Sequence, residues 1–127
     1  MAEGIANKWL KEHHKTGWLA VSAGVFATQG VPTSSGTVEA LSQRNIFFDG
    51  ISKPLTKKMA EGATTVLCMS ASHLEVAEQL TSRAELLDSS GDIIDPIGQD
   101  QAAYDTLADY LELLIANKLT LLTHEGA

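Results

Sequence analysis

The stretch Thr64-Thr65-Val66-Leu67-Cys68-Met69 decides the fold class of this chain. Two threonines lead into four consecutive apolar residues, without the alternation of polar and apolar positions that a half-exposed strand shows. A strand that is apolar on both sides has both of its faces covered, which is the situation of a strand inside a parallel sheet. The stretch therefore predicts a buried strand and a parallel sheet around it.

The residues that follow predict a helix and a second strand. Ser72 and Glu75 have the spacing of a capping box, which places the start of a helix at His73 with Ala77 on its inner face. The run Ala84–Leu87 then predicts a short strand. A strand, a helix and another strand in this order form the repeating unit of a parallel sheet.

Strands and helices alternate along the rest of the chain as well. Periodicity and end signals predict a first helix from Met1 to His13 that is closed by Gly17, a strand over Trp18–Val21, a second helix capped by Thr33, Ser34 or Ser35, a brief helix with Met59 and Ala60, and a last helix with Tyr104, Leu111 and Ile115. This order predicts a three-layer α/β/α fold with a mostly parallel sheet, in one domain that spans 1–127.

Composition limits the classes of partner. The chain has 127 residues, 44% of them apolar, and a formal net charge of −7, which argues against nucleic acid or an anionic membrane as a partner. No apolar run is long enough to cross a bilayer, and the start lacks the pattern of a signal peptide. The single cysteine, Cys68, makes no internal disulfide. We expect a soluble, cytoplasmic protein.

Five short passages, in this order and at these spacings, resemble the low-molecular-weight protein-tyrosine phosphatase family. The passages are Met1-Ala2-Glu3, Ser22-Ala23-Gly24, Pro54-Leu55-Thr56, Met69 with His73, and Asp92-Ile93-Ile94-Asp95-Pro96-Ile97-Gly98. They span nearly the whole chain. The resemblance implies a phosphotyrosine protein phosphatase I-like fold and a hydrolase that acts, in its intact family form, on a phosphoprotein or a small phosphomonoester, without a cofactor.

The resemblance also implies roles for single residues. Asp95 corresponds to the family's general acid, which protonates the leaving oxygen. Pro96 and Ile97 follow it and would lie beside the substrate. Ile97 stands where relatives often place an aromatic ring, and Gly50 stands where many have a histidine, so the resemblance does not extend to a preference for aryl phosphates.

The family's nucleophile has no counterpart in this sequence. In relatives, a first strand and a loop of the form Cys-x5-Arg-Ser-Pro precede the Met-Ala-Glu passage, and the loop supplies the attacking thiolate and the arginine that holds the phosphoryl oxygens. Cys68 does not replace it, because Leu74 stands at the sixth position after it, where the motif requires arginine. We expect an N-terminally truncated form that hydrolyses no phosphomonoester by itself.

The same first strand would contribute to stability. In relatives it lies centrally in the sheet, and its apolar side chains would each contribute roughly 1.5–3 kcal/mol, against a total domain stability of about 5–15 kcal/mol. We therefore expect a marginally stable monomer, or a homo-oligomer that forms through the exposed strand edges.

Other polar residues have simpler interpretations. Asp92 and Asp95 could hold a divalent ion, but two acids three residues apart in a Gly-Ser loop more often shape a turn, and no metal site is predicted. A set of acids in the last helix is interpreted as its first turns and solvated face; it comprises Asp100, Asp105, Asp109 and Glu112.

Two alternative functions remain open. The chain could be a genuine non-catalytic pseudo-phosphatase that binds proteins, but this would need an anion site, and its two arginines, Arg44 and Arg83, are far apart in sequence. It could also be a flavodoxin-like binding or receiver module. A receiver needs acids at its strand ends, where this chain has Ser22, Met69 and Ser70.

Overall fold

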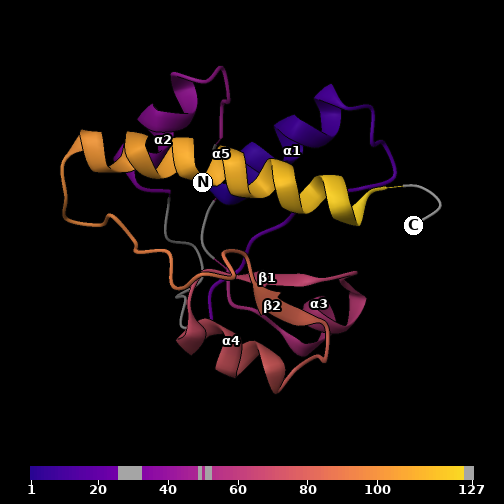
Figure 1. The fold of residues 1–127 in the computed structure, drawn as a ribbon. Helices are drawn as coiled ribbons and strands as arrows, with labels where there is room; N and C mark the ends of the chain where they lie inside the picture. Colours follow the sequence, from indigo (N-terminus) through magenta and orange to yellow (C-terminus); the bar gives the residue numbers. More distant parts are fainter. Residues whose placement is uncertain (26–32, 49, 51–52, 125–127) are drawn as a thin grey trace. The chain divides into compact units, whose positions relative to one another are not determined.

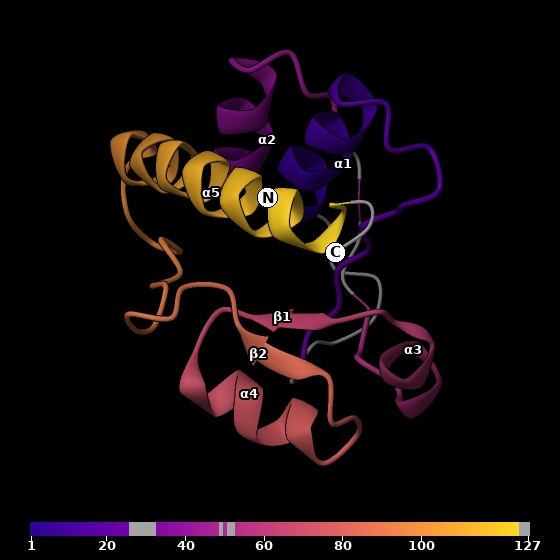
Figure 2. The same cartoon turned by 45° about the vertical axis from the view of Figure 1, so that its right-hand side comes forward.

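The computed structural model describes residues 1–25, 33–48, 50 and 53–124. The chain forms two compact units, both drawn in Figures 1 and 2. One unit comprises Met1–Ser22, Pro32–Gly50 and Pro96–Ala127, and the other comprises Ala23–Val31 and Ile51–Asp95. The single domain over 1–127 stays a prediction.

Helices α1 (Ala2–Glu12), α2 (Ser35–Ser42) and α5 (Gln101–Leu122) belong to the first unit. Both short helices pack against α5, the long orange-to-yellow helix of Figure 1. Apolar residues at three- and four-residue spacing form the buried stripe of α5, as the periodicity predicted. These buried residues are Tyr104, Ala108, Leu111, Ile115 and Leu119.

The start of α2 is fixed by one of the three predicted caps. Ser34 precedes the helix, and its hydroxyl accepts a hydrogen bond from the amide of Thr37 at 3.4 Å. An N-cap hydroxyl in this position satisfies one of the four amides that lack a partner inside the helix. The structure therefore selects Ser34.

The end of α1 differs from the prediction. His14, rather than Gly17, takes the left-handed conformation, with a φ of 57°. The amide of Lys15 then donates to the carbonyl of Leu10 at 2.8 Å, which closes the last turn in the manner of a Schellman motif. Gly17 was wrongly predicted as the residue that closes the helix, because the chain turns at His14, two residues after the helix ends at Glu12.

The second unit contains the sheet. Strands β1 (Val66–Cys68) and β2 (Ala84–Leu86) run parallel, with Val66 opposite Ala84 and Cys68 opposite Leu86. Helix α4 (Ala71–Glu78) connects the strands and packs against both of them (Figure 2), and helix α3 (Lys57–Gly62) precedes β1. An isolated parallel bridge joins Gly24 to Pro54. An α/β fold with a parallel sheet is thus confirmed, with a small sheet.

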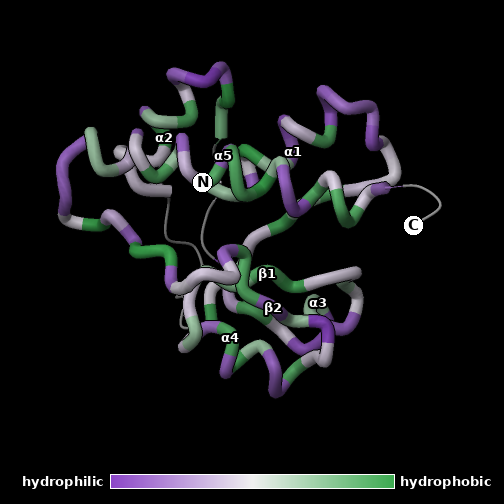
Figure 3. The backbone as a smooth tube through the Cα atoms, in the orientation of Figure 1, coloured by the Kyte–Doolittle hydropathy of each residue, from purple (hydrophilic) through white to green (hydrophobic). Residues whose placement is uncertain are grey.

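Strand β1 is less covered than its sequence predicted. Its three residues are apolar, and the tube is green beside the β1 label in Figure 3, but Val66 and Leu67 are half-buried and only Cys68 is buried. Since β2 is the only strand that pairs with β1 among the described residues, full burial on both faces was a wrong expectation for Val66 and Leu67.

The segment Trp18–Val21 is not a strand in the structure, in contrast to its prediction. The side chain of Asn7 in α1 donates to the carbonyl of Ala20 and accepts from its amide, at 2.9 Å in both cases. Leu19 and Val21 have exposed fractions of 78% and 60%. The segment has the composition of a strand, but the side chain of Asn7 binds the main-chain groups of Ala20 that a neighbouring strand would otherwise bind.

Helix α4 begins two residues earlier than predicted. Its N-cap is Ser70, whose hydroxyl accepts from the amide of His73 at 3.3 Å. Ser72, the predicted cap, lies inside the first turn, with its hydroxyl 3.0 Å from that of Ser70. Both serines could cap a helix by sequence, and the earlier one reaches the third helical amide.

Candidate functional site

Asp95 lies in the connection between β2 and α5, which is a loop as its composition predicted. Its side chain is exposed, Pro96 is buried, and Ile97 has an exposed fraction of 73%. Asp95 and Ile97 are therefore both accessible to solvent, and Pro96 between them is not.

The chain on both sides of Asp95 is held by hydrogen bonds. Before it, the carboxylate of Asp92 accepts a hydrogen bond at 2.8 Å from the amide of Ala71, the first residue of α4. After it, the amide of Gln99 donates to the carbonyl of Pro96 at 2.9 Å, and Gly98 has a φ of 80°, the value that the third residue of a type II turn requires.

Hydrogen bonds also join the passages that carry the family resemblance. Glu3 accepts from the amide of Ser22 at 2.7 Å. The amide of Leu55 donates to the carbonyl of Gly24 at 2.9 Å. Likewise, the amide of Ile93 donates to the carbonyl of Met69 at 2.7 Å. All five passages therefore take part in contacts that connect distant parts of the chain.

Cys68 has the environment of a structural thiol. It ends β1 with an exposed fraction of 6%. Burial raises the pKa of its thiol, and the negative charge of Glu78 raises it further. A nucleophilic cysteine needs the opposite, a lowered pKa and access to the substrate. This is the environment that the sequence led us to expect of a structural thiol at the end of a buried strand.

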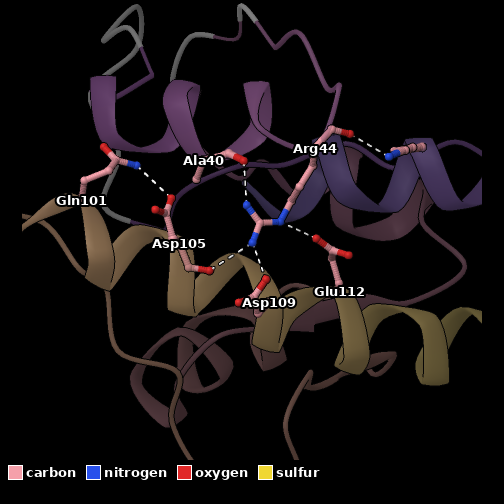
Figure 4. A network of polar contacts seen from close by, with 7 residues as sticks. Ala40, Arg44, Gln101, Asp105, Asp109 and Glu112 are labelled. Carbon is pink, nitrogen blue, oxygen red and sulfur yellow. Dashed lines mark hydrogen bonds and ion pairs between the residues drawn. The ribbon is translucent and has the colours of Figure 1, made fainter.

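Arg44 is bound to two acids of α5. Figure 4 shows its guanidinium pointing toward the carboxylates of Asp109 and Glu112, with which it forms ion pairs. It also donates to the carbonyls of Ala40 at 2.8 Å and Asp105 at 3.2 Å. Although burial acts to lower the pKa of Arg44, the bonds and charges of the two acids outweigh it and raise the pKa.

The sequence pattern did not predict this cluster. Asp109 and Glu112 do lie on the solvated face of the helix, with side chains 76% and 49% exposed, but both also pair with an arginine whose side chain is only 15% exposed. Their spacing of three residues with Asp105 four residues earlier places them on one side of α5. That pattern was a signal for a partner, but it does not identify Arg44.

The second arginine is also used within the protein. Arg83 donates from Nε to the carbonyl of Ala63 at 3.1 Å and from Nη2 to that of Glu61 at 2.5 Å. Both arginines of the chain thus hold protein oxygens, in places separate from Asp95 in sequence. Neither provides the fork that would hold a phosphoryl group beside a nucleophile.

The described residues contain no group of three or more histidine, cysteine, aspartate or glutamate side chains that could hold a metal ion. Within the same residues, no helix is long and apolar enough to cross a membrane.

The sequence matches the model of a known family over nearly its whole length. The model of the low molecular weight phosphotyrosine protein phosphatases matches residues 1–126. The chain belongs to this family.

Two curated relatives carry the name protein-arginine-phosphatase. The one from Bacillus subtilis is 34% identical over 103 residues, which cover 74% of this chain and 69% of the relative. The one from Geobacillus stearothermophilus is 31% identical, also over 103 residues, which cover 74% of this chain and 70% of the relative.

Solved structures give the same result. A low molecular weight protein tyrosine phosphatase from T. tengcongensis matches with a TM-score of 0.88 and 33% identity, covering 94% of this chain and 88% of that chain. A mutant of the YwlE arginine phosphatase with a phosphorylated active site serine matches with a TM-score of 0.88 and 28% identity, covering 98% of this chain and 88% of that chain.

Proposed function

We propose that this chain carries the proton-donating part of a phosphatase, with Asp95 as the general acid. Family membership over residues 1–126 is the observation that carries the proposal. As the bond from phosphorus to the leaving atom breaks, Asp95 gives its proton to that atom and becomes a carboxylate. Ile97 is exposed and would contact the leaving group, whereas Pro96 is buried and does not fit the place beside the substrate that the resemblance implied.

In this proposal the chain of 127 residues catalyses no hydrolysis by itself. It contains no Cys-x5-Arg sequence, and its one cysteine is buried with a raised pKa. Both arginines already bind protein oxygens. Hydrolysis in the family uses a thiolate and a phosphate-binding loop of the form Cys-x5-Arg, and these 127 residues do not contain that motif.

The substrate of the intact form is a phosphoprotein in this proposal. Both curated relatives are named protein-arginine-phosphatase, which favours phosphoarginine over phosphotyrosine. Ile97 supports this choice, because an isoleucine offers no ring for stacking on an aryl group. The side chain is 73% exposed, so it is accessible to a leaving group.

The test is to measure hydrolysis of phosphoarginine, phosphotyrosine and p-nitrophenyl phosphate by two proteins. One is this chain, and the other is the chain extended upstream through the residues that the same reading frame encodes. We expect activity only in the extended protein, with a higher kcat/KM for phosphoarginine. Replacing the cysteine of an upstream Cys-x5-Arg sequence by serine should abolish that activity.

Two variants of the extended protein test the role of Asp95. Asp95→Asn should lower kcat by about 10²–10⁴-fold for a substrate whose leaving group needs a proton. Asp100→Asn changes a nearby acid that caps α5 and should leave kcat within about twofold, since asparagine is an equally good N-cap. An extended protein without activity would contradict the proposal and favour a pseudo-phosphatase.

A further inference from the structure

The loop that carries Asp95 is attached to the start of α4 by two adjacent residues. Oδ1 of Asp92 accepts from the amide of Ala71 at 2.8 Å, and the amide of Ile93 donates to the carbonyl of Met69 at 2.7 Å. Both partners lie where β1 ends and α4 begins. A side-chain bond and a main-chain bond thus fix the same point of the loop.

The bond from Asp92 is not needed to start the helix. Ser70 already caps α4, since its hydroxyl accepts from the amide of His73. Asp92 accepts from a different amide, that of Ala71, and places a negative charge at the positive end of the helix. Removing the carboxylate would leave α4 with its own cap, and the main effect would fall on the loop.

Asp95 lies only two residues after Ile93 and three after Asp92. Ile94 between them has an exposed fraction of 77%, and Asp95 is also exposed. The two contacts with the start of α4 therefore restrain the main chain directly before the acid, and proton transfer requires an acid within hydrogen-bond reach of the leaving atom.

We infer that Asp92 is a positioning residue for Asp95: its carboxylate holds the loop against the first amide of α4 and so defines where the acid lies. The inference rests on the proposed function only for the role of Asp95. The contact itself involves no substrate and no nucleophile, so it can be tested in this chain as it is.

The experiment is ¹⁵N relaxation of the chain and of three variants. In the unaltered chain we expect an amide order parameter of about 0.85 at Asp95, and in Asp92→Ala a value below about 0.6. Asp92→Asn keeps an oxygen acceptor and should restore the order of Asp95. Glu75→Ala removes another exposed acid, from α4 itself, and should leave Asp95 unchanged.

Hydrogen exchange at Ala71 provides a second measurement. In the unaltered chain its amide should exchange at least about tenfold more slowly than an unprotected amide, because it donates to Asp92. This measurement does not depend on whether Asp92→Ala folds. An unprotected Ala71 amide, or an Asp95 that stays rigid in Asp92→Ala, would overturn the inference.

The outcome is separable from that of the proposed function. If the extended protein has no phosphatase activity while Asp92→Ala releases Asp95, the proposed function fails and the positioning contact stands. If activity depends on Asp95 while Asp92→Ala leaves the order of Asp95 unchanged, the proposed function stands and the inference is wrong.

Discussion

The carboxamide of Asn7 pairs with both main-chain groups of Ala20, donating to its carbonyl and accepting from its amide at 2.9 Å each. A carboxamide has the same donor and acceptor as a peptide group, so one side chain of α1 replaces a neighbouring strand. Glu3, four residues earlier on the same side of α1, accepts from the amide and hydroxyl of Ser22. Two side chains of one helix therefore hold Ala20 and Ser22.

Replacing Asn7 by alanine should destabilise the chain by about 1–3 kcal/mol, because both main-chain groups of Ala20 lose their partner in a half-buried position. Urea unfolding followed by circular dichroism measures the change. Asn117→Ala, at an exposed position of α5, is the matched control and should have almost no effect. Equal losses in the two variants would contradict the role of Asn7.

Gly36 has no room for a side chain. A Cβ atom at this position would lie 2.5 Å from a ring carbon of Tyr104. We expect Gly36→Ala to lower the free energy of unfolding by about 1–3 kcal/mol, since the buried ring must move. Gly17→Ala, where a Cβ meets nothing within 4 Å, is the control. A Tyr104→Leu background should reduce the cost of Gly36→Ala if the ring is its cause.

Arg44 connects α2 to α5 through a fork that lysine cannot reproduce. Since the guanidinium binds two exposed carboxylates and two carbonyls at once, Arg44→Ala should cost about 1–3 kcal/mol, and Arg44→Lys should recover less than half of it. Lys57→Ala removes an exposed ion pair with Glu61 and should cost less than about 0.5 kcal/mol. Full recovery in Arg44→Lys would show that charge alone suffices.

The buried thiol of Cys68 predicts a loss of stability at high pH. Burial and the charge of Glu78 raise its pKa in the folded state. Its contribution is therefore complete below the pKa of an unfolded cysteine, about 8.5, and decreases as the pH rises from there through the folded-state pKa. Urea midpoints above about pH 8.5 should fall more steeply in the unaltered chain than in Cys68→Ala. Parallel pH profiles would contradict this account.

Helix positions and the parallel sheet could be predicted because they depend on local patterns. The buried stripe of α5 follows from leucine spacing, and β1 lies within the continuous apolar stretch that predicted it. The C-terminal end of α1 and the N-terminal start of α4 were predicted less well. More than one residue near each of these positions could end or begin the helix, and the three-dimensional arrangement selects His14 at the end of α1 and Ser70 at the start of α4.

Contacts between distant side chains could not be predicted from this one sequence. Nothing local indicates that Asn7 binds Ala20, or that Asp109 and Glu112 bind Arg44. Trp18–Val21 was predicted as a strand because composition reports strand propensity and not the presence of a partner. The role of Asp95 was predicted from the family resemblance, whereas the hydrogen bond from Ala71 to Asp92, which attaches its loop to α4, became visible only in the structure.

The most direct test of the central claim is p-nitrophenyl phosphate hydrolysis by the purified chain of 127 residues, compared with its Cys68→Ser variant. We predict no hydrolysis above the buffer rate in either protein, because the only thiol is buried and no arginine follows it at the required spacing. Steady turnover by the chain that Cys68→Ser abolishes would contradict the account and make Cys68 the nucleophile.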